Sequence, residues 1–137
     1  MQTRGVSIKN QTVLLRGVND DPVVLAELFK KLTQHSVVPY YIFQCRPVRG
    51  VKDNFQVPLL QGYKIIDKAK SLQNGFGKCP RFIMSHPLGK IEIIGELADR
   101  QMIFKFHQNK NTKDASRIFT QQLQPGHTWL DENLNAI

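Results

Sequence analysis

The chain has 137 residues, 41% hydrophobic and 22% charged, which fits a single globular domain of ordinary composition. It contains no apolar run long enough to span a membrane and no apolar core of a signal peptide. Its two cysteines are too few for a disulfide framework or a zinc site. We therefore expect a cytoplasmic protein. The net charge of +8 comes from 19 scattered Lys and Arg residues with no dense basic block between aromatics, so nucleic acid is not an expected partner.

The first predicted elements are a strand within residues 6–18 and a helix after it. The sequence Asn-Asp-Asp-Pro that ends at Pro22 supplies an aspartate N-cap and a proline for the first helical turn. Apolar residues then recur at helical spacing, which predicts a helix from about Pro22 to Gln34.

Residues 37–50 are the most informative stretch, because an apolar, aromatic and β-branched run is followed by a polar loop with two arginines. Pro39 and Pro47 confine the run to about six or seven residues, which is too short for an amphipathic helix and predicts a buried strand. A continuous apolar strand is typical of a parallel sheet that is covered on both faces. The strand ends at Gln44, Cys45 and Arg46.

The next predicted elements are a loop over residues 48–57, a helix that opens at Pro58 and ends at Asn74 and Gly75, and a strand over residues 81–85. The predicted order of elements is strand, helix, strand, helix, strand. This order indicates a parallel α/β sheet. Residues 91–95 and 102–107 then predict a β-hairpin, and the polar tail contains one predicted short helix near residues 115–122. A change in composition near Leu97 divides the chain into predicted segments 1–97 and 98–137.

In parallel α/β proteins, the residues that follow the strands gather at one edge of the sheet. Here that edge would carry Asn19 and Asp20, then Gln44 to Arg46, and then Ser85, His86 and Lys90. Since this set has cations but no paired carboxylates, it suits the binding of an anionic small molecule better than acid–base hydrolysis.

Lys90, in a Pro-Leu-Gly-Lys loop, has two interpretations. A desolvated lysine can form an imine with an aldehyde such as pyridoxal phosphate (PLP), whereas most lysines are solvated surface charges. Arg46 is either a bidentate clamp for a carboxylate or phosphate or an exposed loop cation. Cys45 is favoured as a small buried apolar residue. The four histidines have no metal-ligand spacing, and His86 alone lies at the predicted edge.

Two motifs and a Gly-Lys pair carry a family resemblance: Asn10 to Asp20 (NQTVLLRGVND), Pro39 to Cys45 (PYYIFQC), and Gly89 with Lys90. In order and spacing over residues 4–95, the chain resembles the C-terminal part of the lysine 2,3-aminomutase family of radical SAM enzymes. The resemblance implies parallel β/α units from the C-terminal part of a partial TIM-type barrel, followed by a β-hairpin and a polar tail. It also implies 1,2-amino migration on an amino acid, with PLP holding the substrate amine while S-adenosylmethionine and a [4Fe–4S] cluster generate a deoxyadenosyl radical.

The resemblance also implies roles for four residues. Lys90 matches the lysine that binds PLP, and Gln11 matches a glutamine near S-adenosylmethionine. Arg46 and Ser85 match two pocket positions that are acidic in lysine-specific members. Because an arginine in place of an acid reverses the charge of the pocket, we expect an acidic or neutral amino acid as the substrate rather than lysine.

The sequence departs from the family pattern in three places. The three-cysteine cluster motif and the structural zinc cysteines are missing, so no metal site is expected in this chain, and the glycine-rich loop before Lys90 is shortened to Pro87–Gly89. Because the missing barrel strands would leave a sheet edge unpaired, we expect the chain to self-associate or to need the N-terminal half of the barrel. The alternative function is a basic module without catalysis that binds a polyanion such as nucleic acid, which salt-dependent binding and no affinity for PLP would indicate.

Overall fold

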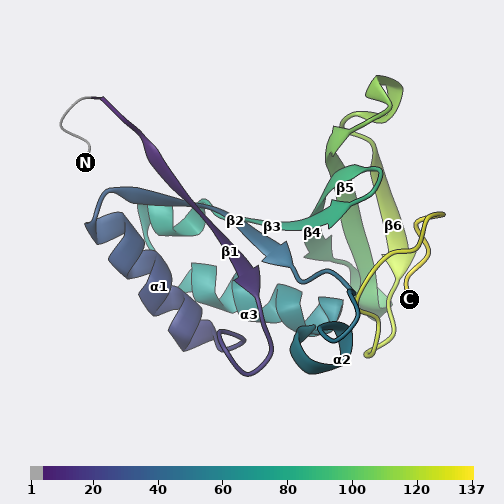
Figure 1. Ribbon diagram of the computed structural model, residues 1–137, viewed down its shortest axis with the longest axis horizontal. Coiled ribbons are helices and arrows are strands. Elements are labelled where there is room, and N and C mark those ends of the chain that lie inside the picture. Colours follow the sequence, from purple (N-terminus) through teal and green to yellow (C-terminus); the bar gives the residue numbers. More distant parts are fainter. Residues whose placement is uncertain (1–4) are drawn as a thin grey trace.

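The computed structural model describes residues 5–137, so the first four residues of predicted segment 1–97 lie outside the described part. One mixed sheet of six strands, in the order β1-β2-β3-β4-β5-β6, runs through the molecule (Figure 1). The strands are β1 (Ile8–Leu14), β2 (Val37–Gln44), β3 (Arg81–His86), β4 (Gly89–Glu96), β5 (Gln101–Asn109) and β6 (Ile118–Gln122). The helices are α1 (Pro22–Gln34), α2 (Lys52–Phe55) and α3 (Leu59–Ser71), joined by 3₁₀ turns η1 (Gly75–Lys78), η2 (Ala98–Arg100) and η3 (Thr112–Asp114).

The N-terminal half confirms the predicted parallel α/β order, because β1 pairs with β2 and β2 with β3 in parallel. Helices α1 and α3 lie on the same side of these strands (Figure 1). The core forms between them because the strands direct alternate side chains toward the helices. Its residues include Leu14, Ile42, Phe82 and Met84 from the strands and Leu25, Phe29, Leu59 and Ile66 from the helices.

Helix α1 has the predicted bounds because its start is fixed by local chemistry. The Asp21 carboxylate accepts hydrogen bonds from the backbone N–H groups of Val23 (2.7 Å) and Val24 (3.3 Å), and Pro22 occupies the first turn. Helix α3 follows Pro58 as predicted but ends at Ser71, earlier than expected. Gly75 instead begins the η1 turn, with φ at +53°.

Loss of the α1 cap gives the first testable prediction. Asp21→Ala is expected to lower the free energy of unfolding by about 1 kcal/mol, because two N–H groups at the start of α1 lose their acceptor. Urea denaturation followed by circular dichroism measures the change. Glu132→Ala, an exposed acid in the tail, is the control and should change stability by less than about 0.5 kcal/mol. Equal effects of the two substitutions would contradict the assigned cap.

The C-terminal half is antiparallel: β3 pairs with β4, β4 with β5, and β5 with β6. The pairing of β4 with β5 confirms the predicted hairpin, but Lys90 lies within β4 and not in a loop. The short helix predicted near residues 115–122 is wrong. That segment contains β6, because residues Ile118 to Gln122 pair with β5 in antiparallel orientation. Among the described residues the sheet is open, with β1 and β6 at its edges.

The tail after β6 packs back onto the core through buried Leu123, Trp129 and Leu130. His86 connects it to the sheet: Leu88 N–H donates to His86 Nδ1 (3.2 Å), so Nε2 carries the proton and donates to the carbonyls of Leu130 (3.2 Å) and Asp131 (3.1 Å). His86 therefore has a structural role at this position. None of the helices in the described part of the chain is both long and apolar enough to cross a membrane.

Candidate site on the open face of the sheet

The side of the sheet opposite α1 and α3 carries no helix within residues 5–137 (Figure 1). We call this side the open face; it carries Lys9, Gln11, Tyr41, Arg81 and Lys90. The expectation of a sheet covered on both faces is therefore wrong for the described residues. Within β2 the aromatic rings shield one another: Tyr41 stacks on Tyr40 (centroids 4.0 Å apart) and meets Phe43 edge-on (5.6 Å).

Three of the four predicted site residues are close together. Ser85 on β3 is the direct cross-strand partner of Lys90 on β4. Arg46, which follows β2, donates from Nη2 to the Ser85 hydroxyl oxygen (2.8 Å). Gln11 lies on the same face at the edge of the sheet, exposed, and pairs in register with Tyr41. The sheet thus brings Arg46, Ser85 and Lys90 together and leaves Gln11 on the outer strand.

Two recesses, each of about 270 Å³, meet at Ser85. The first is lined by Val13, Phe43, Gln44, Arg46 and Ser85. The second is lined by Ser85, His86, Gly89, Lys90, Gln108, Asn109 and Lys110. Their linings contain an arginine and two lysines but no carboxylate, so the local potential favours a small anionic ligand.

Lys90 is held beside an aromatic ring, with its Nζ 5.1 Å from the centroid of Tyr41. The Tyr41 hydroxyl lies 2.7 Å from His107 Nε2, and Arg81 Nη1 lies 3.0 Å from His107 Nδ1. Tyr41, Arg81 and His107 were not predicted as site residues. Tyr41 lies inside the quoted PYYIFQC motif, but the sequence contains no signal that would pair it with His107.

Burial, hydrogen bonding and nearby charges shift the pKa values of Tyr40, Tyr41 and His107. Burial, with the hydrogen bond to Tyr40, raises the pKa of Tyr41 to about 12. The same hydrogen bond, with Lys9, Lys90 and Arg81 nearby, lowers the pKa of Tyr40. Burial and the Arg81 charge lower the pKa of His107, which favours its neutral form.

The cysteines have no metal partners in the described part of the chain. Cys45 is buried, its burial raises the pKa of the thiol, and Cys79 is exposed. Residues 5–137 contain no group of three or more His, Cys, Asp or Glu side chains that could hold a metal ion. The Cys45 thiol therefore fits the predicted role of a small buried apolar residue.

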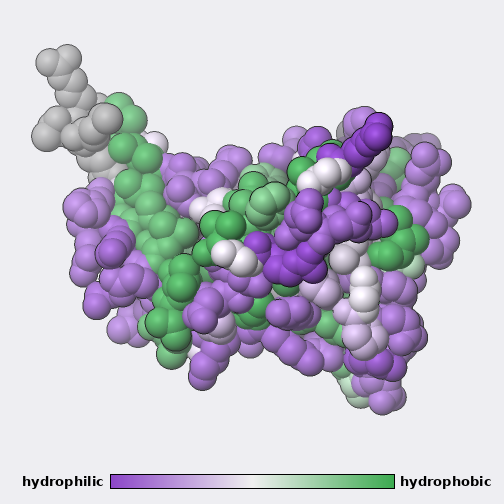
Figure 2. Space-filling view, turned by 60° about the horizontal axis from the view of Figure 1, so that its bottom comes forward, coloured by the Kyte–Doolittle hydropathy of each residue, from purple (hydrophilic) through white to green (hydrophobic). Residues whose placement is uncertain are grey.

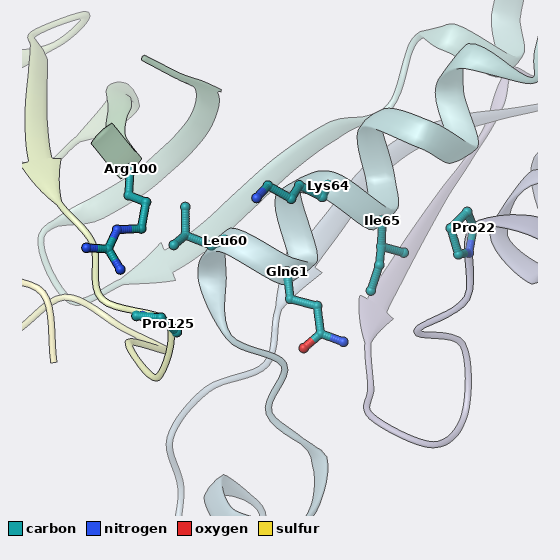
Figure 3. Close-up of a pocket in the computed structure, with 7 residues that line it drawn as sticks. All are labelled: Pro22, Leu60, Gln61, Lys64, Ile65, Arg100 and Pro125. Atoms are coloured by element: carbon teal, nitrogen blue, oxygen red, sulfur yellow. The ribbon is translucent and has the colours of Figure 1, made fainter. Parts of the chain in front are cut away.

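A larger cavity of about 490 Å³ lies away from these residues, on the helix side. Figure 3 shows four of its lining residues on α3, with Arg100 and Pro125 to one side and Pro22 to the other. Its one lysine, Lys64, is paired with Glu96 (Nζ to Oε2 3.8 Å). None of the four predicted site residues lines this cavity, so we do not assign the site to it.

By fold and site, the chain is an α/β domain with a cation-lined recess where its parallel strands end. It is 32% identical over 132 residues to the protein named "Putative L-lysine 2,3-aminomutase" of Aquifex aeolicus, a match that covers 96% of this chain and 35% of that protein. It is 42% identical over 86 residues to L-lysine 2,3-aminomutase of Clostridium subterminale, and 36% identical over 85 residues to glutamate 2,3-aminomutase of Clostridioides difficile. Each of the last two matches covers 62% of this chain and 20% of the relative.

No protein-family profile matches the chain. The relatives nevertheless confirm the resemblance: the chain belongs to the lysine 2,3-aminomutase family and corresponds to its C-terminal part. It spans about a third of the length of the first relative and a fifth of the other two.

The open face fits one of the cofactors that the family implies. PLP needs an amine and a cation for its phosphate, and the recess lined by Lys90 and Lys110 offers both. A [4Fe–4S] cluster does not fit the described residues, because such clusters are held by several cysteines and only one buried and one exposed thiol are present.

Proposed function

We propose that this chain is the part of an amino-acid 2,3-aminomutase that binds PLP and the substrate, and that the enzyme performs a 1,2-amino migration. The observation that supports this most directly is that Ser85, the cross-strand partner of Lys90, also binds Arg46 and lines both recesses, whose linings lack carboxylates. When bound, PLP would supply the electrophilic aldehyde that holds the substrate amine. In this proposal, the parallel units β1 to β3 belong to a partial TIM-type barrel of the radical SAM type.

The proposal gives each residue a separate role. Lys90 would hold PLP covalently through its amine. Arg46 is oriented by its hydrogen bond to Ser85 (Nη2 to Oγ 2.8 Å). It would bind the substrate side chain. Gln11 would approach S-adenosylmethionine from the outer strand of the open face. The [4Fe–4S] cluster would bind to cysteines outside this chain.

The charge of Arg46 supports a substrate other than lysine. A guanidinium at the side-chain end of the recess would repel an ammonium group and pair with a carboxylate. The relatives include proteins named for lysine and for glutamate, so both kinds of substrate occur among their names. We therefore propose an acidic or neutral amino acid as the substrate.

The exposed edge of β1 supports the proposal of a further protein partner, either another copy of the chain or the N-terminal half of a barrel. An unpaired edge strand presents free N–H and C=O groups to another strand. Val6, just before β1, and Val13, within it, are 57% and 41% exposed. Figure 2 shows hydrophobic surface in a band that begins beside the grey N-terminal residues.

Covalent labelling tests the proposed PLP site. The purified chain is mixed with PLP and reduced with borohydride. The Lys90 amine would condense with the aldehyde and release water, and hydride would then reduce the new C=N bond to a stable secondary amine. Peptide mass spectrometry is expected to find most of the label at Lys90, and Lys90→Arg is expected to lower total labelling at least about tenfold, because a guanidinium does not react in this way.

Lys78→Arg, at an exposed lysine in η1, is the matched control and should leave the labelling at Lys90 unchanged. Label spread evenly over the lysines would argue against the site. If a labelled oligonucleotide also binds with a steep salt dependence, the basic binding module becomes the better explanation.

A further inference from the structure

Three strands of the open face contribute one polar side chain each to a single chain of hydrogen bonds. Tyr41 comes from β2, Arg81 from β3 and His107 from β5. His107 lies in the centre, with Nε2 2.7 Å from the Tyr41 hydroxyl and Nδ1 3.0 Å from Arg81 Nη1. The ring of His107 also meets the ring of Tyr41 edge-on, with centroids 5.7 Å apart. Tyr41 is therefore held at its hydroxyl and along its ring.

The direction of these hydrogen bonds follows from the chemistry of the donors. A guanidinium can only donate, so His107 Nδ1 must accept and cannot carry a proton. In neutral His107 the proton is then on Nε2, which donates to the Tyr41 oxygen. The Tyr41 oxygen is therefore the acceptor at the end of this chain of hydrogen bonds, 2.7 Å from His107 Nε2. Arg81 thus selects one tautomer of His107.

The held ring lies against the amine that the proposed function depends on. Lys90 Nζ is 5.1 Å from the Tyr41 centroid, within the range of a cation–π contact. Tyr41 is only 4% exposed, whereas a lysine has a flexible four-carbon stem. Because Tyr41 is fixed and Lys90 is intrinsically mobile, the ring determines where the amine rests.

We propose that Arg81, His107 and Tyr41 form a positioning network that holds the Lys90 amine over the open face. Tyr41 contacts the lysine, and His107 and Arg81 act through Tyr41 by fixing its orientation. The significance of the network for PLP binding rests on the proposed function, but the placement of Lys90 does not.

NMR of the chain labelled with ¹⁵N at histidine tests the direction of the hydrogen bonds. His107 is expected to show a single neutral tautomer with the proton on Nε2. Arg81→Leu removes the donor to Nδ1 and should give a mixture of tautomers, whereas Arg81→Lys keeps a donor and should restore much of the original preference. Arg81 is exposed, so neither substitution disturbs the core. A proton on Nδ1 in the unaltered chain would overturn the proposal.

The position of Lys90 is tested by the ring-current shift of its ε-methylene protons. In the unaltered chain these protons are expected upfield of those of the other lysines, because they lie over the Tyr41 ring. Tyr41→Phe keeps the ring and should keep most of the upfield shift, while Tyr41→Leu should abolish it. Arg81→Leu should reduce it, because His107 no longer keeps the single tautomer that holds the Tyr41 hydroxyl. Backbone amide spectra establish that each variant is folded.

An ordinary lysine shift in the unaltered chain, or equal shifts in the Phe and Leu variants, would overturn the positioning network. These spectra need no PLP, so they are independent of the labelling experiment. If the shift is present but PLP does not label Lys90, the proposed function fails and the network stands. If PLP labels Lys90 without an upfield shift, the network fails and the proposed function stands.

Discussion

Gly89→Ala is expected to lower the free energy of unfolding by about 3 kcal/mol and to abolish selective PLP labelling of Lys90. Gly89 begins β4 with φ at +150°, a conformation that alanine rarely adopts. An added Cβ would also overlap the backbone carbonyl oxygen of Gln108 and lie 2.9 Å from the Asn109 Cα. Because both atoms belong to the main chain of β5, the strands must separate just where Lys90 projects.

Gly126→Ala is the matched control for this prediction. No atom lies within 4 Å of a Cβ added at Gly126, and its φ lies outside the range that strains L-residues. The free energy of unfolding of the Gly126→Ala variant should therefore stay within about 0.5 kcal/mol of that of the unaltered chain. Urea denaturation gives the stabilities, and borohydride trapping gives the labelling of Lys90. If both glycine variants were equally stable, the close approach of β4 and β5 at Gly89 would be wrong.

Phe104→Ala is expected to cost about 3 to 5 kcal/mol of unfolding free energy, because it empties a large volume in the core. Phe104 on β5 is fully buried, and its ring stacks on Phe119 of β6 with centroids 5.3 Å apart. Such a loss is a large part of the about 5 to 15 kcal/mol that stabilises a typical domain. Phe76→Ala, at a ring that is 65% exposed, should cost less than about 0.5 kcal/mol.

Phe104→Ala also tests whether residues 98–137 fold with the rest of the chain. The sheet continues across Leu97, because β4 and β5 pair over most of their length. Trp129, the one tryptophan, reports on the tail by fluorescence, and circular dichroism reports mainly on α1 and α3. If the chain is one cooperative unit, Phe104→Ala should lower both urea midpoints equally. A lower midpoint in fluorescence alone would indicate a separate C-terminal unit.

Elements with strong local signals were predicted from the sequence nearly to the residue. Helix α1 has its expected bounds, because the Asp21 cap and the apolar spacing act within the segment itself. The parallel order of β1 to β3 also followed from the sequence, since strands that alternate with helices have few other arrangements. The family was identifiable for a similar reason: its motifs are contiguous in the chain.

Elements without strong local signals were decided by their partners. A segment as short as Ile118–Gln122 has no definite periodicity, and pairing with β5 makes it a strand rather than a helix. Lys90 was expected in a loop, but the tight β3–β4 turn and the pairing with Ser85 and Gln108 extend the strand through it. In both cases the backbone hydrogen bonds come from residues that the local sequence does not contain.

For the candidate site, the sequence by itself determined which residues match the family pattern: Gln11, Arg46, Ser85 and Lys90. Only the tertiary structure decided that Arg46, Ser85 and Lys90 come together and that Tyr41, His107 and Arg81 join Lys90 on the open face. Tyr41 and His107 are 66 positions apart, and their hydrogen bond depends on the register of β2 to β5. Register is set by side-chain packing across the whole sheet, so a linear sequence carries no local signal for such a contact.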